Sequence, residues 1–155
     1  MRRKVTNRNV VTPESTYNSY EVAKLINYIM ERGKKNAARK IVYDAMDLIK
    51  EMEGKEPMDV FTEAIKNTSP LMEVRSRRVG GANYQVPREV RPERRLYLSM
   101  KWIIDAARSK KGAPMHEKLA DELIAASKNE GEAVRKKENT HKMAEANKAF
   151  AHFAW

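Results

Sequence analysis

The chain has 155 residues and a net charge of +10, and this length suits one compact domain. It contains no cysteine, which excludes disulfides and thiolate metal sites. No apolar stretch is long enough to span a bilayer, and no apolar segment follows the basic N-terminal residues as it would in a secretory signal. The strong positive charge instead indicates a polyanionic partner.

The charge is distributed unevenly along the chain. Residues 1–18 are basic, lack a regular hydrophobic spacing and include Pro13, so they are predicted to form an extended or disordered arm. Residues 43–73 carry a net charge of −5, whereas residues 74–111 carry +8. Basic segments could therefore converge on one face of the molecule while acidic segments stay outside it.

Three helices are predicted before Pro70, each from apolar residues that recur every three or four positions. The first begins after Ser19, a favourable N-cap residue, and ends at Gly33. The second covers about 36–52. The third begins at Pro57, because proline is well tolerated in the first turn of a helix.

The hydrophobic spacing then changes to about two. Residues 72–79 and 83–90 are predicted to be two strands joined by a turn at Gly80 and Gly81. Pro87 marks the second strand as an edge or a bulge. An isolated two-stranded ribbon is marginal in water, so this hairpin is expected to pack on the helices or on a partner.

Three more helices follow, from Pro92 to about Ser109, from Pro114, and over about 132–150. Their short connections favour antiparallel neighbours. The predicted fold is mainly α: a six-helix bundle with a projecting two-stranded β-hairpin between helices three and four and a basic N-terminal arm. The predicted division is an arm over 1–18 and a single helical RNA-binding domain over 19–155, with the hairpin at about 72–90.

Arginine is concentrated in and after the hairpin. Seven of the 14 arginines lie within 75–95, a stretch without lysine. Arginine makes two-pronged contacts with phosphate and stacks on bases, so this stretch predicts a finger that binds nucleic acid rather than a merely solvated surface. These arginines are Arg75, Arg77, Arg78, Arg88, Arg91, Arg94 and Arg95.

Other basic residues extend this pattern. Arg94, Lys101 and Arg108 recur every seven residues, which places them on nearly one side of the fourth helix, where only Glu93 and Asp105 are acidic. Two basic clusters near helix starts are weaker candidates, because bound phosphate would be favourable there. Two aromatic residues could stack on a base, although aromatic residues at helical spacing more often belong to the core. These clusters and aromatic residues are Lys34 with Lys35, Arg135 with Lys136 and Lys137, Tyr84 and Trp102.

Nothing in the sequence indicates catalysis. The three histidines are scattered, and His141 with Glu145 lacks the second histidine that a zinc site of this spacing would have. No serine has an evident general base. The protein is therefore predicted not to be an enzyme and to need no cofactor or metal. A DNA-binding helical regulator with a β-ribbon stays open as an alternative, and a metal-dependent nuclease is a more distant one.

Four segments resemble the bacterial-type family of small-subunit ribosomal protein seven: 33–35 with the following helix, the hairpin stretch 74–87, the link 90–92, and the ending 141–155. The resemblance covers nearly the whole chain. It implies a mostly helical domain with a projecting hairpin that is a primary binder of the 3′ major domain of small-subunit rRNA. It also implies nucleation of head assembly and a final position near the messenger exit and the exit-site tRNA.

The resemblance implies rRNA, neighbouring small-subunit proteins, and nearby messenger RNA and exit-site tRNA as partners, with no membrane and no obligate homo-oligomer. The expected location is the cytoplasmic small subunit, with an organellar ribosome left open. Charge pattern and resemblance together give the candidate RNA-binding residues Arg2, Arg3, Lys4, Arg8, Lys34, Lys35, Arg75, Arg77, Arg78, Arg91, Arg94, Arg95, Lys101, Arg108, Lys110, Met115, Lys136, Lys137 and Lys142.

Overall fold

A computed structural model describes residues 11–153, so the candidate residues Arg2, Arg3, Lys4 and Arg8 lie outside the described residues. The protein is mainly helical, with one antiparallel hairpin between the third and fourth helices, which confirms the predicted fold class. No helix within 11–153 is long and apolar enough to cross a membrane. The elements are α1 (Tyr20–Ile29), α2 (Lys35–Glu53), α3 (Pro57–Thr68), β1 (Met72–Val79), β2 (Ala82–Glu89), α4 (Pro92–Ser109), α5 (Met115–Ser127), α6 (Glu132–Ala146) and the 3-10 helix η1 (Lys148–Phe153).

Local signals set most helix boundaries. The Ser19 hydroxyl accepts a hydrogen bond from the backbone N–H of Val22 and caps α1. Gly54 has a φ of 62° and ends α2 in the left-handed conformation that glycine adopts without strain. The end of α1 lies at Ile29, earlier than the predicted Gly33, because Met30 leaves the helical region with a ψ of 130°.

The hydrophobic core lies among α1 to α5, with the first turn of α6 added to it. Each helix presents its apolar face to the others. The large side chains that are at most 1% exposed include Leu25, Ile49, Phe61, Ile104 and Leu123, one from each of α1 to α5. Among the described residues, this core contains none from the hairpin. The hairpin therefore needs support from elsewhere.

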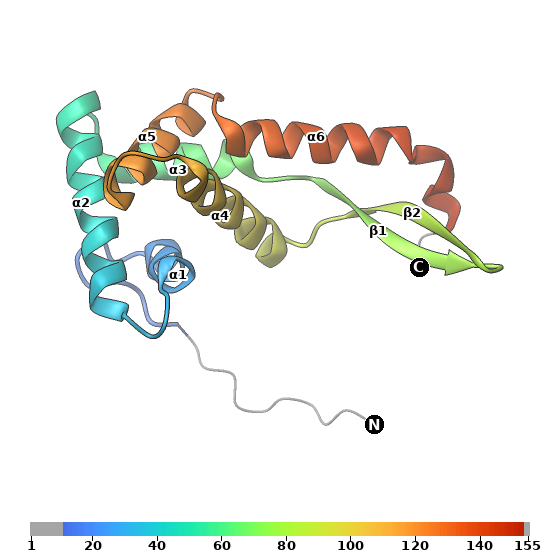
Figure 1. Ribbon diagram of the computed structural model, residues 1–155, viewed down its shortest axis with the longest axis horizontal. Helices are drawn as coiled ribbons and strands as arrows, with labels where there is room; N and C mark the ends of the chain where they lie inside the picture. Colours follow the sequence, from blue (N-terminus) through green and yellow to red (C-terminus); the bar gives the residue numbers. More distant parts are fainter. Residues whose placement is uncertain (1–10, 154–155) are drawn as a thin grey trace.

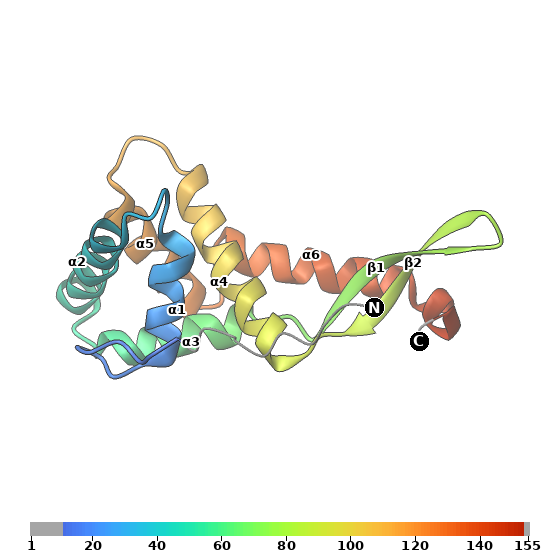
Figure 2. The ribbon, with the colours of Figure 1, turned by 90° about the horizontal axis from the view of Figure 1, so that it is seen from below.

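The C-terminal part of the chain provides that support. In Figure 1 and Figure 2, α6 leaves the other helices and runs alongside the hairpin. The sequence predicts one helix to Phe150, but α6 ends at Ala146 and η1 turns back. This turn places the rings of Phe150 and Phe153 against Tyr84, with centroids 5.2 and 5.1 Å away. The expectation that the hairpin packs on helices is thus confirmed.

The stretch from the last turn of α3 to the start of β1, residues 67–71, is held by three side chains from other helices. Arg95 of α4 donates to the Pro70 carbonyl at 3.1 Å, and Lys137 of α6 donates to the Asn67 carbonyl at 2.6 Å. The backbone N–H of Leu71 donates to Nε2 of His141 at 2.9 Å. These bonds fix the direction in which the hairpin leaves the bundle.

Glu122 joins α5 to the start of α6. Its buried carboxylate accepts a hydrogen bond from the backbone N–H of Ala133 at 3.0 Å and pairs with Lys110 at 3.0 Å. A carboxylate at this position satisfies one of the unpaired N–H groups of a helix N-terminus. Gly131 immediately precedes α6 and has a φ of 93°. A Cβ on this residue would lie 2.8 Å from a Glu122 carboxylate oxygen. A side chain at position 131 would therefore be strained by this φ and would displace the Glu122 carboxylate.

Glu14 holds the segment before α1 against α2. Its buried carboxylate accepts hydrogen bonds from the backbone N–H groups of Thr16 and Tyr17, at 2.8 and 2.9 Å, and from the Tyr43 hydroxyl. Burial acts to raise the pKa of Glu14, but the hydrogen bonds from Tyr43, Tyr17 and Thr16 together outweigh it, so this pKa lies below its ordinary value. The backbone at 14–17 is thereby fixed.

Candidate nucleic-acid interface

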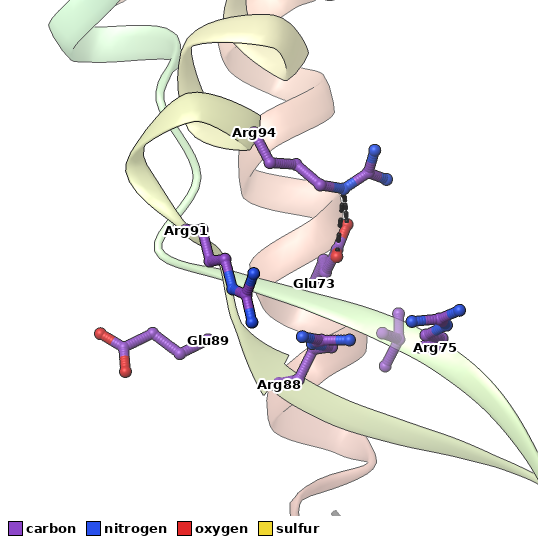
Figure 3. Close-up of a pocket in the computed structure, with 7 residues that line it drawn as sticks. Glu73, Arg75, Arg88, Glu89, Arg91 and Arg94 are labelled. Carbon is purple, nitrogen blue, oxygen red and sulfur yellow. Dashed lines mark hydrogen bonds and ion pairs between the residues drawn. The ribbon is translucent and has the colours of Figure 1, made fainter. Parts of the chain in front are cut away.

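A concave surface lies where the base of the hairpin meets the first turn of α4 (Figure 3). Its volume is about 670 Å³. Four of its seven lining residues are arginines, so we call it the arginine concavity. It is lined by Glu73, Val74, Arg75, Arg88, Glu89, Arg91 and Arg94.

The pairing of β1 with β2 and the short link between β2 and α4 bring the lining residues of this surface together. Glu73 lies opposite Arg88 in the antiparallel ladder, and Arg75 follows two residues later, so all three project from the same side of the hairpin. Arg91 lies in the short link between β2 and α4, and Arg94 lies in the first turn of α4. The partial positive charge of a helix N-terminus adds to that of the arginines. The arrangement favours an extended anion such as a nucleic-acid backbone.

An ion pair sets the orientation of Arg94. Its Nε donates to both carboxylate oxygens of Glu73, at 3.2 and 2.9 Å. Figure 3 shows the two terminal nitrogens of Arg94 directed away from Glu73. The Arg94 side chain is 52% exposed, and exposed ion pairs contribute at most about 1 kcal/mol. A phosphate can therefore bind the terminal nitrogens or replace Glu73.

The cations of the α4 stripe, Arg94, Lys101 and Arg108, all have acidic partners. Lys101 pairs with Asp105 at 2.9 Å, within the helix. Arg108 pairs with Glu31 at 2.9 Å, from the loop between α1 and α2. The sequence of α4 contains only one of these three acidic partners, Asp105. Glu73 and Glu31 could not be found from it, because they approach α4 from other elements. The cations stay at the surface in these pairs.

A second, smaller cavity of about 310 Å³ brings together three candidates that are distant in the sequence. Lys34 comes from the start of α2, Arg108 from the end of α4 and Met115 from the start of α5. Glu31, the partner of Arg108, and apolar residues of α1 and α2 complete the lining. Lys35 diverges from Lys34: it donates to the Asn27 side chain and lines a different cavity.

Five candidates bind a backbone carbonyl or a buried carboxylate of the protein. Arg108, besides its pair with Glu31, donates to the Ile29 carbonyl at 3.3 Å. Arg95 and Lys137 hold the connection before β1, as described above. Arg77 donates to the Phe153 carbonyl, and Lys110 pairs with the buried Glu122. These residues have a structural role in the fold, and their assignment to RNA binding stays a prediction. Three further candidates are exposed, on the hairpin and on α6: Arg78, Lys136 and Lys142.

Both aromatic residues that the sequence suggested for base stacking pack against other parts of the protein. Tyr84 packs on Phe150 and Phe153, and Trp102 packs partly buried against the core. The exposed aromatic residue of α4 is Tyr97, at 37% exposure. Sequence reasoning missed Tyr97, although its position three residues after Arg94 is a signal that could have found it.

The histidines form no catalytic arrangement. Nε2 of His141 is an acceptor for the Leu71 N–H, and burial, with a further contribution from Lys137, lowers the pKa of His141. Within residues 11–153, no group of three or more His, Asp or Glu residues is placed to hold a metal ion. His141 is explained by its part in holding the hairpin connection.

A helical bundle with an arginine-lined concavity at the base of a projecting basic hairpin has the electrostatic character of proteins that bind nucleic acid. The chain matches the family model described as Ribosomal protein S7p/S5e over residues 1–148, and it belongs to this family of structural, non-enzymatic ribosomal proteins.

Bacterial relatives named small ribosomal subunit protein uS7 match nearly the full length. The relative from Thermotoga neapolitana is 56% identical over 100% of both chains. The relative from Thermoanaerobacter sp. (strain X514) is 57% identical over 96% of this chain and 95% of its own. The one from Caldanaerobacter subterraneus is 59% identical over 94% of this chain and 93% of its own. The resemblance drawn from the sequence motifs is thus confirmed at the level of the family.

Proposed function

We propose that this protein is a structural constituent of the small ribosomal subunit that binds the 3′ major domain of the rRNA directly and nucleates assembly of the head. Family membership supports the ribosomal role. The observation that carries the RNA-binding role is the arginine concavity, where four arginines from β1, β2, the link before α4 and α4 itself line one surface. No single element could present them together.

The proposed mechanism is electrostatic recognition of RNA shape. Arginine forks and lysine point charges neutralise phosphates at an rRNA junction, as in many protein–RNA contacts. The deep major groove of A-form RNA hides its base edges, so backbone shape dominates over sequence. We assign the direct contacts first to surface cations that bind neither a backbone carbonyl nor a buried carboxylate of the protein: Lys34, Arg78, Arg91, Arg94 and Lys101.

The hairpin is proposed to extend toward messenger RNA and the exit-site tRNA, because its tip points away from the bundle (Figure 2). Residues 1–18 are proposed to be a basic arm that adds phosphate contacts, and 19–155 to act as a single domain. Neighbouring small-subunit proteins complete the set of partners, and no obligate homo-oligomer is needed. The proposed location is the ribosome of the cytoplasm.

The test compares three binding partners for the purified full chain: a transcript of the 3′ major domain, a transcript of the 5′ domain of the same rRNA, and duplex DNA. We expect the 3′ major domain to bind most tightly, with a log–log salt slope of roughly −4 to −5 if about six phosphates are neutralised. Equal affinity for all three would contradict specific rRNA recognition, and preference for DNA would support a regulator instead.

A further inference from the structure

Tyr97 lies at the border of the basic stripe on α4. At about 100° per residue, it is about 60° around the helix from Arg94, about 40° from Lys101 and about 20° from Arg108. Its exposure of 37% is high for a tyrosine in a helix that buries its opposite face. A large aromatic ring therefore lies between Arg94 and Lys101, on the surface to which phosphates would be attracted, while Arg108 is about 16 Å further along the helix axis.

The ring of Tyr97 packs against the ring of a second tyrosine. Tyr28 of α1 packs against it edge-to-face, with centroids 5.4 Å apart and ring planes at 84°. Such pairs fix orientation and contribute about 0.5–1.5 kcal/mol beyond area burial in measured cases. Tyr84, by contrast, is in contact with two phenylalanine rings. Of the aromatic residues near the basic surface, Tyr97 combines a fixed orientation with an exposed ring.

We propose that Tyr97 is a stacking platform for an unpaired base of the bound RNA, while Arg94 and Lys101 hold phosphates on either side of that nucleotide. This inference rests on the proposed rRNA-binding function and deepens it. The two cations are about 10 Å apart along the helix axis, with Tyr97 between them. A strand that follows the stripe would bring a base over the ring.

The platform would add a selectivity that phosphate contacts lack. Every base has a π-face, so stacking tolerates any sequence, but a paired base within a helix is already stacked on its neighbours. Tyr97 would thus favour a junction that contains an unpaired nucleotide over a continuous duplex. Shape recognition by the cations and recognition of an unpaired base by Tyr97 would act together.

The experiment compares Tyr97→Phe, which keeps the ring, with Tyr97→Leu, which removes it at similar volume. Binding to the 3′ major domain transcript is measured over a range of salt concentrations. We expect Tyr97→Phe to bind like the wild type and Tyr97→Leu to bind about five- to a hundred-fold more weakly. The salt slope should be unchanged in Tyr97→Leu, because stacking releases no counterions. Arg94→Gln is the contrast, with a slope shallower by roughly 0.7–0.9.

A second measurement locates the base. A photoreactive phenylalanine analogue at position 97 should cross-link to one unpaired nucleotide of the transcript. Removing that base from the RNA should weaken binding by wild-type protein as much as Tyr97→Leu does, and it should have no further effect on the Leu variant. This non-additivity is expected only if ring and base are in contact.

The outcomes separate the two proposals. If the wild type does not bind the transcript, the proposed function fails. If it binds and Tyr97→Leu is equally tight, or cross-links appear only at paired nucleotides, the platform is wrong. If Tyr97→Leu loses affinity only in proportion to lost thermal stability, Tyr97 merely packs α1 against α4, and this too overturns the inference.

Discussion

At the scale of single residues, buried carboxylates hold the backbone where the chain changes direction. Glu14 binds two N–H groups ahead of α1, and Glu122 binds the N–H of Ala133 at the start of α6. Both are acceptors for groups that would otherwise be unsatisfied, and a buried group without its partner costs about 1–3 kcal/mol. These acids stabilise the fold rather than contribute to a site.

We predict that Glu122→Ala lowers the free energy of unfolding by roughly 1–3 kcal/mol, because it leaves the Ala133 N–H and the Lys110 ammonium without their partner. Urea denaturation measures the change. The matched control is Asp121→Ala, an exposed acid one residue earlier, which should change stability by within about 0.5 kcal/mol. Equal stability of the two variants would show that Glu122 does not cap α6.

His141 gives the stability of the protein a pH dependence. Its pKa is lowered from the ordinary value of 6.5 by burial and by Lys137. The folded state therefore favours the neutral ring. The contribution of the neutral ring to stability is complete above pH 6.5, and it is lost as the pH falls toward the lowered pKa of the folded state. Protonation of Nε2 would also remove the acceptor of the Leu71 N–H. Other charged residues that line the cavity at His141 are Glu21, Lys66, Arg95 and Lys137.

We predict that the thermal midpoint falls between pH 7.5 and pH 5.5 in the wild type and falls less in His141→Gln. Glutamine can accept the same hydrogen bond without titrating. Glu14 does not contribute to the change between pH 7.5 and pH 5.5. Its pKa lies below the ordinary value of 4.5, so its protonation changes stability only at lower pH. A wild-type midpoint as insensitive to pH as that of the variant would refute this role.

At the scale of elements, the hairpin is stable because other elements cover part of it. A two-stranded ribbon is marginal by itself, and here α6 lies along it while η1 places two phenylalanine rings on Tyr84. The tip around Gly80 and Gly81 is exposed. The hairpin should therefore open in two steps, with the tip less protected than the segment near Tyr84.

We predict that the double variant Phe150→Ala with Phe153→Ala lowers hydrogen-exchange protection in β2 around Tyr84 and leaves the bundle folded. The two substitutions remove ring packing between the hairpin and η1, which lies outside the core of α1 to α5. The control is Phe61→Ala in that core, which should lower global stability by about 3–5 kcal/mol. Unchanged protection in β2 of the double variant would mean that α6 alone holds the hairpin.

At the scale of the whole molecule, the elements divide into two parts. The bundle of α1 to α5 forms one end, while the hairpin with α6 and η1 extends to the other (Figure 1). The arginine concavity lies at their junction. The acidic stretch 43–73 falls mostly on α2 and α3. An elongated protein of this kind can contact RNA over a longer path than a compact one.

We predict that the arm contributes to RNA affinity and not to folding. Replacing its four cations, Arg2, Arg3, Lys4 and Arg8, by glutamine should make the salt slope shallower by up to roughly 3–3.5, at roughly 0.7–0.9 per phosphate. Urea unfolding should not change, because the core begins at Val22. Glutamine at four exposed lysines outside the candidate set, Lys40, Lys50, Lys55 and Lys66, would reveal a general charge effect. If the arm variant keeps the wild-type slope, the arm makes no phosphate contacts.

The sequence by itself determined the fold class and most of the element boundaries. Hydrophobic spacing, Ser19 as a cap, and prolines at the first turns of α3 and α4 are local signals, because helix and hairpin geometry depend on neighbouring residues. The concentration of arginine in 75–95 predicted a basic finger there, and the concavity lies in this part of the chain because the hairpin and the start of α4 are adjacent in sequence. The family resemblance rested on the same local motifs.

Only the tertiary structure decided the partners of the charged and aromatic side chains. Glu73 and Glu31 pair with cations of α4, while Arg95 and Lys137 bind backbone carbonyls near the hairpin. Tyr84 packs on the chain's C-terminal part, and Tyr97, which the pattern did not single out, lies exposed among cations. These contacts join residues far apart in sequence. Packing of the helices sets them, and no local periodicity encodes which distant side chain will be adjacent.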